Sequence, residues 1–215
     1  MTTPRSRVRL LSGAMDALTR AGVKVVEGWP EGVDPVQQST SFGFHVGLFF
    51  AFEQRDPNVA TMAEFIEHET QRMSARVAWS RYFNDFDVFL CPANFTPAIP
   101  HDTRPFEERT IMTPEGERPY QNQPFWISHA SLPGLPAVVA PIGRTSIGLP
   151  VGAQIVGPLY EDDTPVTFAE LLADVIGDTS VRDLANSSIK HHPGASRPGV
   201  GRATMRGRRR RVGRG

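Results

Sequence analysis

The chain has 215 residues, 40% of them hydrophobic, which is enough to bury the core of one globular domain or two small ones. Its one cysteine, Cys91, excludes an intramolecular disulfide and an all-cysteine zinc site, and no apolar stretch reaches the roughly 20 residues of a membrane helix. Residues 197–215 hold eight of the 23 basic residues and none of the 23 acidic ones. We therefore expect a cytoplasmic protein without cofactor or metal, whose body spans residues 1–186 and whose residues 187–215 are a disordered Arg/Gly-rich tail.

The first part of the chain predicts a helix followed by a strand. Apolar residues recur at helical spacing over residues 5–21, and Gly22 follows where a C-terminal cap is expected. Residues 23–27 are then rich in valine, which predicts a short strand. A helix joined to a strand through one glycine is typical of α/β proteins.

Two further helices are predicted where an aspartate is followed by proline. Asp34 with Pro35 and Asp56 with Pro57 each fit an N-cap followed by proline at the first helical position. We expect both helices to pack against a sheet. The apolar residues expected on the inner side of the second are Met62, Phe65, Ile66, Met73 and Val77.

The second half predicts three strands and a last helix. Residues 87–91, 137–142 and 151–156 are apolar runs, and the last two should be neighbouring strands. Residues 92–124 are rich in proline and form a long excursion without clear periodicity. The last helix should begin at Thr164-Pro165 and end at Gly177, with one apolar face made by Phe168, Leu171, Leu172 and Val175.

The common catalytic motifs are absent from the sequence, including the nucleophile elbow, the phosphate-binding loop and the zinc-binding H-E-x-x-H pattern. Cys91 could act as a nucleophile, but no basic residue near it in sequence would lower its pKa, which favours a buried inert thiol. The other candidates fit structural roles better than catalytic ones, because no second ligand or base stands at a productive spacing. They are His45, His68, the pair His101-Asp102 and the pair Ser128-His129.

Three segments closely resemble the C-terminal block of the amidase signature family. Residues 86–92 read F-D-V-F-L-C-P, residues 131–143 read S-L-P-G-L-P-A-V-V-A-P-I-G, and residues 148–157 read G-L-P-V-G-A-Q-I-V-G. Ser131 and Pro133 depart from the family's usual residues. The resemblance extends over about residues 5–178 and implies an α/β fold of α/β/α layers with a mixed sheet, forming part of the amidase signature fold.

The resemblance also implies a mechanism whose residues this sequence lacks. Family members cleave amides with a Lys, a Ser in a cis peptide and a nucleophilic Ser, all of them in the N-terminal half. The two lysines here are Lys24 and Lys190, and no Gly/Ser-rich loop carries the serines. No catalytic residue can therefore be assigned. Phe125 and Trp126, just before the Gly134 loop, are candidates for the wall of the substrate pocket, with core packing as the alternative.

These observations predict the C-terminal fragment of an amidase-type hydrolase acting on carbon–nitrogen amide bonds. It should be inactive alone and should bind a small-molecule amide only if a second part supplies the Lys-Ser-Ser residues. One alternative is a non-catalytic interaction protein whose basic tail binds nucleic acid or another polyanion, with no membrane partner. A third is that the tail is an out-of-frame translation of a shifted gene end.

Overall fold

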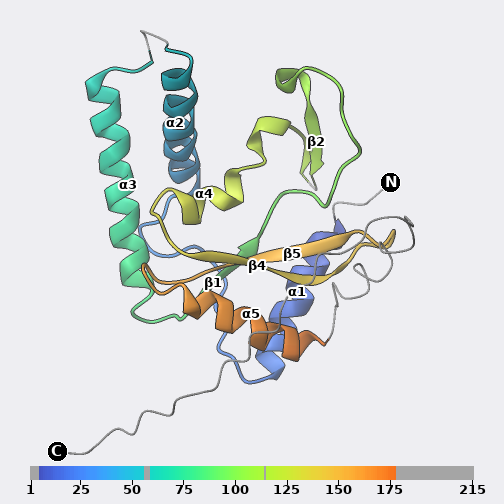
Figure 1. Cartoon of the computed structure of the whole chain (residues 1–215). Coiled ribbons are helices and arrows are strands. Elements are labelled where there is room, and N and C mark those ends of the chain that lie inside the picture. Colours follow the sequence, from blue (N-terminus) through green and yellow to red (C-terminus); the bar gives the residue numbers. More distant parts are fainter. Residues whose placement is uncertain (1–4, 56–58, 114, 178–215) are drawn as a thin grey trace, which may run out of the picture. The chain divides into compact units, whose positions relative to one another are not determined.

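The computed structural model describes residues 5–55, 59–113 and 115–177 (Figure 1). The expected boundary at residue 187 and the expected tail lie outside these residues. None of the described helices is long and apolar enough to cross a membrane. The helices are α1 (Arg5–Arg20), α2 (Pro35–Glu53), α3 (Met62–Tyr82), α4 (Phe125–Ser131) and α5 (Asp163–Ile176). The strands are β1 (Phe89–Pro92), β2 (Thr110–Thr113), β3 (Gly116–Pro119), β4 (Ala137–Arg144) and β5 (Pro150–Val156).

The main sheet has three strands in the order β1-β5-β4, and both pairs are antiparallel. Cys91 of β1 and Val139 of β4 both stand opposite Gln154 of β5. The predicted neighbours, residues 137–142 and 151–156, are thus confirmed as adjacent strands. Their pairing shifts by one residue between Pro141 and Gly143. Gly143 has φ +146, and a Cβ there would lie 2.6 Å from Leu10 of α1, so helix and sheet approach closely at this bulge.

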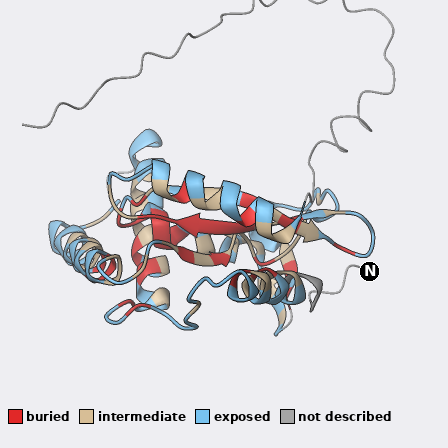
Figure 2. Ribbon diagram, turned by 90° about the horizontal axis from the view of Figure 1, so that it is seen from below, coloured by how far each residue is buried: buried red, intermediate tan, exposed pale blue. Residues whose placement is uncertain are grey.

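The sheet carries a hydrophobic core on each face, as expected of an α/β/α arrangement (Figure 2). On one face α1 and α5 cover the sheet, and the core there comprises Ala14, Leu18, Ala140, Ile142, Val151, Ala153, Ile155 and Leu172. On the other face lie the C-terminal part of α3 and α4. That core comprises Val33, Ala75, Ala78, Trp79, Phe89, Cys91, Ala130, Leu135 and Val156.

Helices α2 and α3 pack against each other, and their N-termini follow two different capping patterns. Asp34 caps α2 as predicted, because its carboxylate accepts hydrogen bonds from the N–H groups of Val36 and Gln37. The prediction that Asp56-Pro57 opens α3 is wrong. The helix begins at Met62, and Thr61 caps it in a capping box with Glu64.

The predicted inner face of α3 is also wrong. Met62, Phe65, Ile66, Met73 and Val77 are all exposed, whereas the buried residues of α3 are Ala75, Ala78 and Trp79. Two alanines one turn before and beside a tryptophan let the helix approach the sheet while Trp79 fills the space, its ring 5.0 Å from that of Phe89. Burial follows this close-packed stripe rather than the larger apolar side chains.

The strand predicted at residues 23–27 is absent from the described sheets. Helix α1 ends as expected at Gly22, which has φ +89, and Val23 donates to the carbonyl of Leu18. The chain then runs extended alongside β1 without pairing to it, because a groove separates the two segments. Val26 is accordingly exposed.

The remaining connections agree with the sequence in part. The excursion after β1 contains a small hairpin of β2 and β3 and two 3-10 turns, Phe106–Glu108 and Tyr120–Asn122. Helix α5 starts at Asp163, one residue before Thr164-Pro165, and ends at Gly177 with φ +76. Of its predicted apolar face Leu172 is fully buried, but Leu171 is exposed.

Candidate functional site

Helix α4 carries both residues that the sequence proposed for a pocket wall. This seven-residue helix starts after Pro124, and its first turn is tightened by the Ser128 hydroxyl, which donates to the Phe125 carbonyl over 2.6 Å. The Phe125 ring packs against Phe95 and His129, with centroids 5.5 and 5.0 Å apart. Phe125 is thus placed in side-chain packing, and its role in substrate binding stays a prediction.

Trp126 lies instead at the edge of a groove. Its ring stacks on Trp29 at 5.9 Å with an interplanar angle of 11°, and its carbonyl accepts a hydrogen bond from Gln154 Nε2 at 3.0 Å. These contacts tie the helix to β5 and to the segment after α1. The indole Nε1 is buried and has no hydrogen-bond partner in the described structure, so Trp126 retains one donor that a ligand could use.

The groove beside Trp126 has a volume of about 750 Å³. One wall is the extended segment of residues 23–29, and the other is residues 85–92, which include β1. Apolar and aromatic side chains from α1, α3 and α5 complete it. Its size and lining suit a ligand or a segment of polypeptide.

His129 is the most strongly perturbed group near this groove. It is fully buried, its Nδ1 lies 3.4 Å from Gln38 Oε1, and its Nε2 has no hydrogen-bond partner in the described structure. Burial lowers the pKa of His129 to about 4, so the imidazole is neutral at pH 7. Sequence reasoning noted the Ser128-His129 pair but contained no signal of its burial, which arises when α4 packs against α2.

A serine and a histidine meet between α2 and α3. Ser41 Oγ lies 3.0 Å from His68 Nδ1 and also hydrogen-bonds Gln71. The pair has the geometry of a nucleophile and its base, but Ser41 has no exposed surface, so substrate cannot reach it. The expectation that His68 is a structural, hydrogen-bonded histidine is thus confirmed.

The other sequence candidates are not assembled into a catalytic group. Burial raises the pKa of the Cys91 thiol to about 12, with Gln154 Nε2 3.4 Å from its sulfur, which confirms a buried inert thiol. His45 Nε2 lies 4.0 Å from Glu69, which mainly pairs with Arg72. Asp102 pairs with Arg104, and these hydrogen bonds lower the pKa of the carboxyl to about 2.

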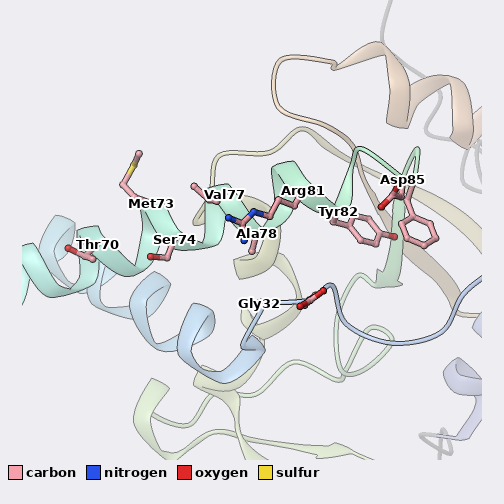
Figure 3. Close-up of a pocket in the computed structure, with 11 residues that line it drawn as sticks. Gly32, Thr70, Met73, Ser74, Val77, Ala78, Arg81, Tyr82 and Asp85 are labelled. Atoms are coloured by element: carbon pink, nitrogen blue, oxygen red, sulfur yellow. The ribbon is translucent and has the colours of Figure 1, made fainter.

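A second groove, of about 810 Å³, runs along the exposed side of α3 (Figure 3). Met73, Ser74, Val77 and Arg81 form its long side, with Gly32 across from them. It contains no paired nucleophile and base. In the parts of the chain that the structure describes, no three His, Cys, Asp or Glu side chains are grouped to hold a metal ion.

The family of the chain follows from a sequence comparison. Residues 50–165, more than half of the chain, match the sequence model of the family described as Amidase. The chain belongs to the amidase family. The match includes α3, β1, α4, β4 and β5, so the sheet and most of its two cores lie within the matched region.

Known amidase relatives are longer proteins. A subunit of the glutamyl-tRNA(Gln) amidotransferase of Tropheryma whipplei (strain Twist) is 31% identical over 129 residues, which cover 57% of this chain and 21% of the relative. The corresponding protein of Nitrobacter winogradskyi is 31% identical over 85 residues, covering 40% and 17%. The chain thus spans about a fifth of the length of the curated relatives it matches.

Solved structures confirm the fold of the amidase domain. A bacterial aryl acylamidase of the amidase signature family has a TM-score of 0.58 at 15% identity, over 82% of this chain and 42% of that one. A protein of a vestigial complex, related to the origins of an s-triazine catabolic enzyme, has a TM-score of 0.61 at 17% identity, over 79% and 39%. The α/β amidase signature fold expected from the sequence is therefore confirmed for this part of the molecule.

Proposed function

We propose that this chain forms the C-terminal part of an amide hydrolase, which cleaves carbon–nitrogen amide bonds only together with a part that supplies the nucleophile and base. The observation that carries the proposal is the amidase family match over residues 50–165. The match covers the sheet and α4, which hold the groove and its aromatic lining. The chain would thus contribute framework and pocket wall, while the chemistry comes from residues outside it.

The side chains of this chain do not supply the chemistry themselves. Cys91 is buried and held as a thiol, Ser41 is sealed between two helices, and His129 is enclosed by aromatic rings. Lys24 lies on the groove wall without a serine partner in the described structure. A nucleophile must be both activated and within reach of the substrate carbonyl, and no described residue meets both conditions.

Purified chain should therefore leave 4-nitroacetanilide and glutamine unhydrolysed. A fusion that places the region preceding the match in the Tropheryma whipplei relative upstream of Met1 should gain activity on an amide. Within that fusion Trp126→Ala should raise KM more than it lowers kcat, whereas Ile147→Ala, in the exposed β4–β5 turn, should change neither. Turnover by the chain alone that survives Cys91→Ala would overturn the proposal.

A second function rests on the sequence of residues 197–215, whose eight arginines have no acidic neighbours within that segment. Such a segment binds polyanions through counterion release, so affinity for duplex DNA should fall by roughly a thousandfold over a fivefold rise in salt if about five phosphates are engaged. Deleting residues 197–215 should abolish this binding. Binding that survives the deletion would point to the body of the chain instead.

A further inference from the structure

Two stretches of backbone face each other across the groove with their hydrogen-bonding groups unpaired. Strand β1 pairs with β5 along one edge, and its other edge carries no strand in the described sheet. Opposite this edge, residues 24–29 make no backbone-to-backbone hydrogen bonds within the described part of the chain. Unpaired backbone groups inside a folded layer are unfavourable and act as templates for strand pairing.

The groove lies inside the sheet layer rather than on the outer surface. Met15 and Leu18 of α1 and Phe168 of α5 line it on one side, and Leu18 and Phe168 belong to the core that these helices form on the sheet. Tyr82 and Trp126 line it on the other side and belong to the opposite core. The helices that cover the sheet therefore also cover the groove, so it occupies the position of a strand.

The size of the groove agrees with this position. A strand of five residues is about 17 Å long, and with a width of about 4.8 Å and a layer thickness of about 10 Å it occupies roughly 800 Å³. The groove measures about 750 Å³. Trp29 limits one end, because its ring lies 5.4 Å from that of Phe89 on β1.

We infer that this groove receives one extended, apolar strand from the part of the amidase fold that the relatives have and this chain does not match. The solved relatives are more than twice as long as the region they share with this chain, so such a part exists in each of them. Both faces of the groove are apolar, which selects a strand of continuous Val, Ile or Leu character rather than an alternating one. The inference rests on the proposed function, since the same part would bring the nucleophile.

The test compares labelling of the full chain with labelling of the fusion described above. A single cysteine at Val25→Cys in a Cys91→Ala background reports on the groove, and Ile147→Cys is the matched control in the exposed β4–β5 turn. We expect maleimide to label Val25→Cys at least tenfold more slowly in the fusion, with Ile147→Cys unchanged. Equal rates at Val25→Cys in a folded fusion would overturn the inference.

Hydrogen exchange of the full 215-residue chain provides a second measurement that does not depend on the fusion. Amides 24–28 should exchange without protection at every protein concentration. Protection that grows with concentration would show that a second copy occupies the groove, and constant protection would show that a segment of the same chain does; either result overturns the inference. An active fusion with an open groove would contradict the inserted strand alone, whereas an inactive fusion with a closed groove would contradict the proposed function alone.

Discussion

The sheet and the α2–α3 hairpin distribute polar and apolar residues in opposite ways. On β5, the central strand, Ala153, Ile155 and Val156 have no exposed surface. Between α2 and α3 the buried positions include the polar Gln38 and Ser41, while the outer faces of the same helices carry exposed apolar residues. These are Val36, Phe49, Phe50, Phe52, Met62, Phe65, Ile66, Met73 and Val77.

This difference separates two physical roles. The sheet gains its stability from apolar burial on both faces, as a domain core does. The hairpin is aligned by directional hydrogen bonds, which fix the register of two helices, and its apolar side chains remain available on the outside. Exposed apolar groups in such number are typical of surfaces that contact other polypeptide, so the hairpin is organised for contact and the sheet for stability.

The largest expected effect contrasts the same substitution in the two regions. Ile155→Ala removes a fully buried side chain from β5 and should lower the free energy of unfolding by about 2–5 kcal/mol. Ile66→Ala, at an exposed site on α3, should change it by less than about 0.5 kcal/mol, since alanine also favours the helix. Urea unfolding monitored by circular dichroism measures both. A similar loss for the two variants would show that the outer face of α3 is covered in solution.

His129 connects the regions, because α4 places it between Gln38 of the hairpin and the aromatic residues beside the sheet. Its pKa falls from 6.5 to about 4 on folding, so the fold favours the neutral imidazole. The stabilisation is complete above pH 6.5 and is lost as pH falls toward 4, amounting to about 3 kcal/mol. In His129→Gln the loss of stability between about pH 7 and pH 4.5 should be smaller than in the native chain. Identical pH profiles would mean that His129 is accessible to protons in the folded state.

How far the sequence predicts this molecule depends on whether the pattern is local. The strands at residues 137–142 and 151–156 and the capping of α2 by Asp34 were predictable, because continuous apolar runs and an Asp-Pro pair act through near neighbours. The start of α3 was missed because Thr61 and Glu64 form a capping box without the proline that drew attention to Asp56.

The candidate site depended more on tertiary contacts and was predicted less well. Phe125 and Trp126 were identified from their position before the Gly134 loop, but their different environments follow from Trp29 and Phe95, which are distant in sequence. The inner face of α3 was assigned to large apolar residues, whereas close helix–sheet packing selected alanines. Nor could the residue pattern at 23–27 show that its neighbouring strand position is a groove.

Ser41 tests whether hydrogen bonds hold the hairpin together. Ser41→Ala removes a buried hydroxyl from between His68 and Gln71 and should cost about 1–3 kcal/mol, because both partners lose a hydrogen bond inside the helix pair. Ser74→Ala, on the exposed side of α3, is the matched control and should have almost no effect. If both variants unfold at the same urea concentration, apolar contacts rather than this network align the helices.

The smallest expected effect concerns the N-terminus of α3, where the hairpin depends on capping alone. Thr61 accepts a hydrogen bond from the N–H of Glu64, and the Glu64 carboxylate accepts from the N–H and hydroxyl of Thr61, which also lowers the pKa of Glu64. Thr61→Ala should therefore cost about 1 kcal/mol by leaving these N–H groups without their capping partners. Thr70→Ala is the control, since its hydroxyl bonds the Ile66 carbonyl within the helix and alanine is the better helix former there. A loss of about 1 kcal/mol in Thr61→Ala and none in Thr70→Ala, both read from urea unfolding, would show that directional bonds at the helix end stabilise the hairpin; equal stability of the two variants would assign that role to packing.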